Sequence, residues 1–85
     1  MEKIYLNGKK MIELENTHRY LKRKFMFDNY YGENLDALWD LLSERKDTIK
    51  VIIFNSEDIL INQGSYGISL LKVFKDLENV ELILR

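Results

Sequence analysis

In the stretch Lys50-Val51-Ile52-Ile53-Phe54, a lysine is followed by four consecutive large apolar residues. Short apolar runs rich in β-branched residues are typical of buried strands, although periodicity alone is also compatible with a buried helix. A strand that shows no alternation of polar and apolar residues is usually covered on both faces, as in a parallel sheet. We therefore predict a central strand over residues 50–54 that is covered on both faces.

Two further strands are predicted near the two ends of the sequence. Residues 3–6, Lys-Ile-Tyr-Leu, precede the turn pair Asn7-Gly8, and this combination predicts a short strand that ends in a turn. Residues 80–84, Val-Glu-Leu-Ile-Leu, alternate in part and predict a closing strand.

Two helices are predicted between the first strand and the central one. The first presents a single apolar face, which consists of Leu14, His18, Leu21 and Phe25. A loop over residues 29–33 follows, and Asn34 is a good N-cap for a second helix. The apolar face of this second helix consists of Leu35, Leu38 and Leu42. Asp36 falls in its first turn, where the helix dipole favours an anion.

Two more helices are predicted between the central and the closing strand. Ser56-Glu57-Asp58 can open a short helix that Gly64 closes. Another helix begins at Ser65 or Tyr66, and its predicted buried face consists of Ile68, Leu71, Phe74 and Leu77. Strands that are joined through helices pair in parallel with right-handed crossovers. We therefore predict an α/β fold, a three-stranded parallel sheet packed with about four helices.

Composition limits the class of protein further. The chain has 85 residues, of which 46% are hydrophobic and 32% charged, and it has no cysteine. This fits a single domain over residues 1–85 with a thin core that no disulfide supports. Neither a signal-peptide pattern nor an apolar run of the ~20 residues that span a membrane is present. We therefore expect a cytoplasmic protein without a membrane partner.

Charge is unevenly distributed along the chain, although the formal net charge is only −1. Residues 25–44 contain no lysine or arginine and carry five acidic residues: Asp28, Glu33, Asp36, Asp40 and Glu44. A local acidic surface attracts a cationic partner even when the total charge is close to zero.

Residues for catalysis are sparse. The single histidine, His18, lies on the apolar face of the first predicted helix, which favours a hydrogen-bonded core histidine over a general base. There is no cysteine, and no serine lies in a context that resembles a nucleophile elbow. The four glycines are scattered and form no phosphate-binding loop. We predict no catalytic residue, no cofactor and no enzymatic activity.

Asp36 and Asp40 share one helix face at spacing i, i+4, where like charges destabilise an isolated helix by roughly 0.2–0.5 kcal/mol. Three interpretations compete: a solvated acidic face, a metal site with oxygen ligands, and a binding face for a cationic partner. A metal site would require more ligands within a compact loop. The aromatic residues of the same stretch favour the binding face, because large aromatics beside charges are enriched at hot spots. They are Tyr30, Tyr31 and Trp39. Aromatics among acids disfavour direct binding of nucleic acid.

Residues 30–40, Tyr-Tyr-Gly-Glu-Asn-Leu-Asp-Ala-Leu-Trp-Asp, resemble the central segment of the barstar family, the intracellular inhibitors of the extracellular ribonuclease barnase. Asn7-Gly8, His18 with Leu21, and residues 71–76 are also similar, and the chain length agrees. The resemblance implies a three-stranded parallel sheet with four helices. It also implies a protein that is monomeric when free and forms a 1:1 complex with a basic ribonuclease.

By this resemblance, the second helix and the loop before it enter the active site of the ribonuclease. Asp40 takes the place of the RNA phosphate, Asp36 meets a second arginine, and Tyr30 packs on the catalytic histidine. The other implied contacts are Tyr31, Gly32, Asn34 and Trp39, with Asp76 as a peripheral anion on the last helix.

Two departures from the family concern the rim of this predicted site. The family carries a Gly-Trp pair after the second helix where this chain has Glu44-Arg45, so the predicted rim consists of Ser43, Glu44 and Arg45. An arginine here faces a basic enzyme unfavourably unless Glu44 compensates. Asp28 replaces a proline ahead of the tyrosine pair, which predicts a looser loop.

Two alternative functions remain open at this point. One is an immunity or antitoxin-type module for a different cationic toxin, with the scaffold retained and the rim altered. The other is an enzyme or metal-binding domain that uses Asp36 and Asp40.

Overall fold

The predicted central strand is β2 (Ile49–Phe54), which lies between β1 (Glu2–Asn7) and β3 (Val80–Leu84). Both pairings are parallel, and Ile4, Val51 and Leu82 align across the sheet. A computed structural model that describes residues 1–85 therefore confirms the three-stranded parallel sheet and the α/β class.

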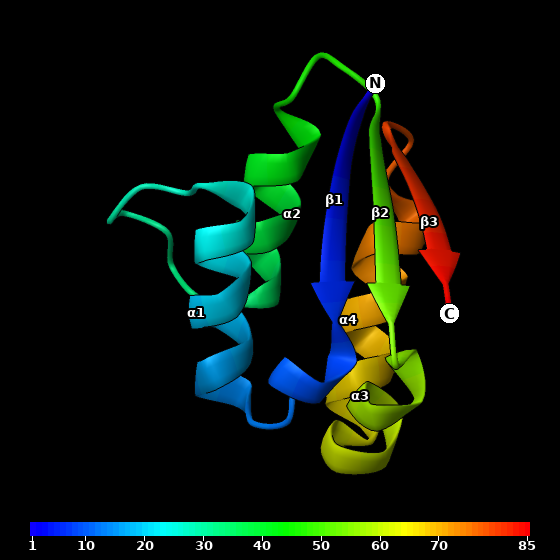
Figure 1. Ribbon diagram of the computed structural model, residues 1–85. Helices are drawn as coiled ribbons and strands as arrows, with labels where there is room; N and C mark the ends of the chain where they lie inside the picture. The colour runs from blue at the N-terminus through cyan, green and yellow to red at the C-terminus, as the bar shows by residue number, and fades with distance from the viewer.

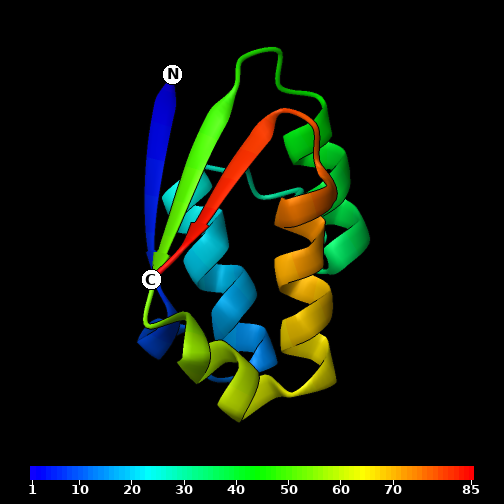
Figure 2. The ribbon, with the colours of Figure 1, turned by 90° about the vertical axis from the view of Figure 1, so that its right-hand side faces the viewer.

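Helices make both connections between the strands. The elements are η1 (Gly8–Lys10), α1 (Leu14–Phe25) and α2 (Leu35–Ser43) before β2, then α3 (Ser56–Gln63) and α4 (Ser65–Asp76) before β3. Figure 2 shows α1, α2 and α4 on one face of the sheet, with α3 at its lower end. In Figure 1, α1 and α2 lie on the β1 side and α4 lies behind β2 and β3. None of these helices has the length and apolar character needed to cross a membrane.

The hydrophobic core lies between the sheet and this single layer of helices. Ile49, Val51 and Ile53 of β2 are almost completely buried, and they pack in one cluster with the leucines and phenylalanines of the helices. Full burial of one such side chain contributes roughly 1.5–3 kcal/mol. The central strand therefore supports the helices above it.

The prediction that β2 is covered on both faces is wrong. Its even-numbered side chains point away from the helices, and Phe54 is 44% exposed. Ile52 is nevertheless only 6% exposed, because Tyr5 and Ile83 flank it in register on the neighbouring strands. A residue buried by its neighbours within a sheet gives the same local pattern as one that is buried by a helix.

The predicted helix faces are correct in part. His18, Leu21 and Phe25 of α1 are buried as expected, whereas Leu14 is exposed. The buried side of α4 consists of Gly67, Leu70 and Phe74, so the prediction is correct for Phe74 and for Leu77 beyond it, and wrong for Ile68, which is 61% exposed. Leu71 is partly buried.

The buried side of α4 differs from the predicted one because of a close contact at Gly67. A Cβ atom on this residue would lie 2.8 Å from the carbonyl oxygen of Ile59 in α3. Because the two helices approach each other through this glycine, Leu70 points into the core and Ile68 points to solvent.

The predicted helix boundaries are confirmed. Asn34 caps α2, since its side-chain oxygen accepts the N–H of Ala37 at 2.8 Å. Gly64 closes α3 with a φ of +53°, a conformation that glycine adopts without a steric penalty.

Gly8 provides a test of this architecture. A Cβ atom here would overlap the carbonyl group of Asn55 and lie 3.3 Å from the Ile59 side chain. We expect Gly8→Ala to lower the free energy of unfolding by about 1–3 kcal/mol, because the backbone must shift to make room. Urea denaturation measures this free energy, and Lys10→Ala, at an exposed position of the same turn, should change it by less than about 0.5 kcal/mol. Equal effects of the two substitutions would contradict the close contact.

Candidate functional site

Of the acidic and aromatic residues predicted as a binding site, Asp36, Trp39, Asp40 and Tyr30 lie at the surface of α2 and of the loop before it, whereas Tyr31 is buried. Asp36, Trp39 and Asp40 occupy the solvent side of α2, and we call these three residues the acidic face. Asp36 and Asp40 are exposed, and Trp39 is 39% exposed despite its size. Tyr30, in the preceding loop, is 94% exposed.

The core determines which side of α2 forms this face. Leu38 and Leu42 are completely buried, and α2 packs against α4 through its inner side. Residues 36, 39 and 40 lie on the opposite side because of the helical repeat. The acidic face is therefore held on a rigid element that is capped at Asn34.

No cation within the molecule neutralises the acidic face. The three ion pairs of the structure are Glu15–Arg19, Glu2–Arg45 and Lys50–Glu81, and none includes Asp36, Asp40 or Asp76. The last turn of α2 contains no basic residue. Asp40 lies at the start of that turn, where the helix dipole disfavours an anion. Asp36, in the first turn, is favoured by the same dipole.

Asp28 holds the loop that leads to α2. Its carboxylate oxygen Oδ1 accepts the backbone N–H of Tyr30 at 2.8 Å, and its carbonyl oxygen accepts the N–H of Tyr31 at 3.2 Å. An aspartate that accepts from the backbone two residues ahead closes a turn. Asp28 thus forms a hydrogen-bonded turn at the position of the family's proline, and the looser loop stays a prediction. Further along, the Asn34 side-chain amide donates to the carbonyl oxygen of Gly32 at 3.2 Å.

The two adjacent tyrosines differ in their environments. Tyr31 is only 5% exposed, and its ring packs on Phe27 with a centroid distance of 4.7 Å. Its hydroxyl lies 2.6 Å from Nδ1 of His18, while Nε2 of His18 lies 2.5 Å from the hydroxyl of Tyr66. Tyr31 therefore supports the loop from inside, whereas the Tyr30 ring is exposed to solvent.

His18 is confirmed as a core histidine with both ring nitrogens hydrogen-bonded. Burial lowers its pKa below 6.5, and the nearby Glu33 carboxylate opposes this shift. Burial also raises the pKa of Tyr31 and that of Tyr66. A neutral imidazole has one donor and one acceptor nitrogen, so one tyrosine donates to His18 and the other accepts from it.

The structure brings Asp76 next to the acidic face. Trp39 and Ser43 of α2, Arg45 and Asp76 together line a shallow hollow of about 330 Å³. Asp76 ends α4, so its carboxylate comes from an element that follows α2 by a complete strand and a helix. The peripheral anion thus lies beside Trp39, as an extension of the acidic face.

The acidic residues are not gathered into a group of potential metal ligands. No group of three or more histidine, aspartate or glutamate side chains lies close enough together to hold a metal ion. Asp36 and Asp40 therefore lack the further ligands that a bound divalent cation requires.

Comparison with known proteins identifies the relationship. Residues 1–81 match the family described as "Barstar (barnase inhibitor)". The chain belongs to the barstar family. It is also 37% identical, over 79 residues, to the Bacillus subtilis (strain 168) protein named "Putative ribonuclease inhibitor YrdF". The match covers 92% of this chain and 87% of that relative, so the similarity extends across nearly the entire fold.

Within this barstar-family chain, Arg45 is bound to its own protein. Its Nη1 atom pairs with Oε1 of Glu2 at 3.0 Å, and its Nη2 atom donates to the carbonyl oxygen of Phe25 at 2.8 Å. The guanidinium also lies 5.7 Å and 6.0 Å from the ring centres of Phe25 and Phe27. Within the free protein it is Glu2, rather than the neighbouring Glu44, that pairs with Arg45. At the same rim the Ser43 hydroxyl donates to the Asp40 carbonyl oxygen at 3.0 Å, and Glu44 is exposed.

Two residues outside the predicted site, Tyr66 and Asp28, also shape the site of this barstar-family chain. Tyr66 holds His18 from α4, 48 residues away in the sequence, and no local pattern indicates such a partner. The turn at Asp28 has a local signal, because an aspartate two residues before the loop tyrosine favours a turn.

The pKa of His18 predicts how stability depends on pH. Because its pKa is lower in the folded state, the unfolded chain binds this proton more readily. The contribution of His18 to stability is therefore complete above about pH 6.5 and is lost as the pH falls through the folded-state pKa. We expect urea denaturation to show falling stability from about pH 7 to pH 5, with at most about 1.4 kcal/mol per pH unit due to His18.

Two measurements check the origin of this slope. His18→Gln should remove the part of the slope that lies between about pH 5 and pH 7, before the carboxylates titrate. NMR titration of the only histidine in the folded wild-type protein should give a pKa below 6.5. An unshifted or raised NMR pKa would contradict the assigned cause.

Proposed function

We propose that this protein inhibits a small basic ribonuclease by covering its active site with α2 and the loop of residues 28–34. The observation that carries the proposal is the set of unpaired carboxylates of Asp36, Asp40 and Asp76, which lie around an exposed tryptophan. Membership of the barstar family and the name of the Bacillus subtilis relative support inhibition of a ribonuclease. On this proposal the protein is a binding protein and not an enzyme.

Asp40 is the proposed anchor in the phosphate site of the enzyme. A ribonuclease active site is preorganised with cationic groups that stabilise the negative charge of the reacting phosphate. A carboxylate on a rigid helix can occupy that place, and it carries no bond that the enzyme cleaves. In the free protein the Asp40 carboxylate is disfavoured by the helix dipole and by repulsion from Asp36. Cations of a partner that surround the two carboxylates offset both unfavourable interactions.

Tyr30 is the proposed aromatic contact with the catalytic histidine of the ribonuclease. Its ring is almost completely exposed, while its backbone N–H is held by Asp28. A tyrosine side chain supplies a large contact area at a low cost in conformational entropy. Because the turn beneath Tyr30 is already formed, less order has to be imposed on binding.

Asp36 and Asp76 are proposed to pair with further cations around the enzyme site, with Trp39 packed between them. Gly32 and Asn34 complete the contact on the loop side, and Ser43 and Glu44 complete it at the rim. Exposed carboxylates of this kind increase the rate of encounter with a basic protein, whereas desolvated central pairs slow its dissociation. Because the proposed contacts form one face of a single chain, we propose a 1:1 complex.

Alanine substitution of the three aspartates tests this arrangement. We expect Asp40→Ala to weaken inhibition of a barnase-type ribonuclease by about 2–5 kcal/mol, roughly 30- to 5,000-fold, because it leaves enzyme cations buried and unpaired. The barnase–barstar complex is itself one of the systems from which such energies of charged interface pairs are known. Asp36→Ala should have a smaller effect and Asp76→Ala the smallest, since these residues lie further from the proposed anchor. Titration of RNA cleavage against inhibitor concentration measures all three.

Two outcomes of this titration would overturn parts of the proposal. Equal, negligible effects of the three substitutions would contradict the proposed orientation. Absence of inhibition by the wild-type protein would favour a different cationic toxin as the partner. In that case the rim of Ser43 and Glu44 is the surface on which to seek the difference.

The same face should reduce the stability of the free protein. We expect Asp40→Asn to raise the free energy of unfolding by on the order of 0.5 kcal/mol, because it removes an anion from the last turn of α2 and its repulsion from Asp36. This corresponds to a rise in Tm of roughly 2–4 °C. Asp36→Asn is the matched control, since it relieves the same repulsion but loses a favourable interaction with the helix dipole. If Asp40→Asn were no more stable than Asp36→Asn, Asp40 would not carry the proposed electrostatic strain.

A further inference from the structure

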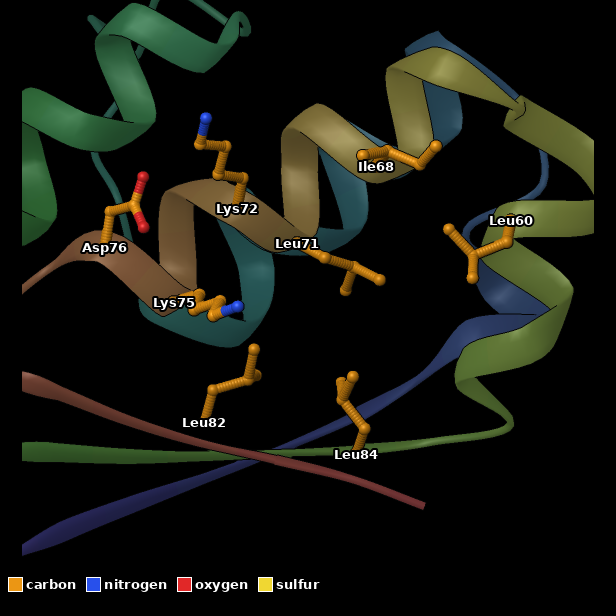
Figure 3. Close-up of a pocket in the computed structure, with 8 residues that line it drawn as sticks. All are labelled: Leu60, Ile68, Leu71, Lys72, Lys75, Asp76, Leu82 and Leu84. Carbon is orange, nitrogen blue, oxygen red and sulfur yellow. The ribbon is translucent and has the colours of Figure 1, made fainter.

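An apolar groove of about 360 Å³ runs between α4 and the edge of the sheet at β3. Leu60 of α3, Ile68 and Leu71 of α4, and Leu82 and Leu84 of β3 line it (Figure 3). Three of these side chains, Leu60, Ile68 and Leu84, are exposed. The groove volume falls within the range of roughly 300–1,000 Å³ that is usual for ligand sites.

The backbone of β3 is free along one side of this groove. β3 pairs only with β2 and therefore forms an edge of the sheet. The Asn79 carbonyl oxygen accepts from Ile49, and the Arg85 N–H donates to Ile53, so odd-numbered residues hydrogen-bond toward β2. In a parallel strand the residues between them direct their N–H and C=O groups the other way. Leu82 and Leu84 thus direct their backbone groups outward, beside the groove.

The two edges of the sheet differ in their protection. At β1 the Asn7 N–H donates to the hydroxyl of Tyr20 at 2.9 Å, and Arg45 covers Glu2. β3 has only one charged residue, Glu81, whose carboxylate is turned to Lys50 in the same sheet. Edge strands are usually blunted by charge, proline or a covering element because they otherwise pair with another chain. The edge of β3 therefore has the character of a pairing site.

The charge at one end of the groove is positive. Lys72 and Lys75 line it together with Asp76, and neither lysine forms an ion pair. Figure 3 shows the Lys75 side chain extending toward Leu71 and Leu82, whereas Lys72 points away from β3. An acidic side chain that enters the groove can therefore meet the Lys75 ammonium, with apolar side chains next to it.

We propose that this groove binds an extended segment of another protein, which adds as a fourth strand to the free edge of β3. Side chains alternate between the two faces of an extended strand, so every second residue of the segment points into the groove. Two of the groove-facing residues of the segment are apolar and contact Leu84, Leu60 and Ile68. The next groove-facing residue is acidic and pairs with Lys75. Strand addition of this kind takes affinity from the backbone and specificity from alternate side-chain pockets.

The charge distribution favours such a segment over a second copy of this chain. A two-fold pairing of two β3 edges centred near Leu82 would bring Lys75 of both copies to one interface. Like charges at an interface oppose association. An acidic and apolar segment instead neutralises Lys75 while it covers the exposed leucines.

A synthetic peptide provides the test. The probe is acetyl-Glu-Thr-Leu-Thr-Leu-Thr-Glu-amide with a fluorescent label, which offers leucine and glutamate to the groove in either strand direction. We expect saturable binding by fluorescence anisotropy. We also expect slower hydrogen exchange at the amides of Leu82 and Leu84, because their outward N–H groups become hydrogen-bonded.

Variants at exposed positions separate this groove from non-specific association. Ile68→Glu and Lys75→Glu should each weaken peptide binding at least tenfold, while Ile61→Glu on the exposed side of α3 changes it less than twofold. Lys75→Glu should in turn bind the probe in which lysine replaces glutamate. Thermal melts show whether each variant is folded, and each should inhibit the ribonuclease as the wild type does. Peptide binding is measured without any ribonuclease, so its outcome is independent of the proposed inhibition.

Several results would overturn the proposal. One is that the wild-type protein fails to bind the probe, and another is that Ile68→Glu binds it unchanged. A third is that binding survives in both of two methylated peptides, one with N-methylated threonine amides and one with N-methylated leucine amides. In the proposed complex one of these two sets of amides pairs with β3, so one methylated peptide should lose binding. A fourth is a wild-type dimer by sedimentation that Ile68→Glu dissociates, with no peptide binding, because the groove would then serve a second copy.

Discussion

Coverage of the sheet by helices on one side only is the constraint on which the rest of this structure depends. Parallel strands need crossover connections, and here α1, α2 and α4 pack on the face that carries Ile49, Val51 and Ile53. This layer presents the outer side of α2 to solvent, and with it the acidic face. The same arrangement leaves the edge of β3 without a covering element, beside the exposed side of α4.

The loop before α2 depends on a second, polar constraint inside the core. His18 joins Tyr31 of the loop to Tyr66 of α4, so three separate parts of the chain meet at one buried imidazole. Buried polar groups of this kind are retained only when they are hydrogen-bonded. On the surface above them, Asp28 closes the turn that displays Tyr30. Interior and surface contacts thus cooperate to order a loop that contains no regular secondary structure.

On α2, the features that suit a binding role are those that the isolated protein does not need. Leu38 and Leu42 would anchor the helix with any polar residue on its outer side. An aspartate in the last turn opposes the helix dipole, and an exposed tryptophan leaves apolar surface in water. Such departures from the most stable sequence are expected where a surface is shaped by a partner. Arg45 differs, because its charge is used within the fold to join Glu2 to the end of α1.

Local sequence by itself determined the strands, the four helices, the Asn34 cap and the shared side of Asp36 and Asp40, since these follow from periodicity and short-range hydrogen bonding. The eleven residues 30–40 also indicated the barstar family. Only the tertiary structure decided that Tyr31 is buried while Tyr30 is exposed, and that Ile68 faces solvent. Only the fold paired Arg45 with Glu2, 43 residues away. Periodicity records how a segment repeats, whereas burial and pairing depend on which distant segment packs against it, and that is known only once the chain has folded.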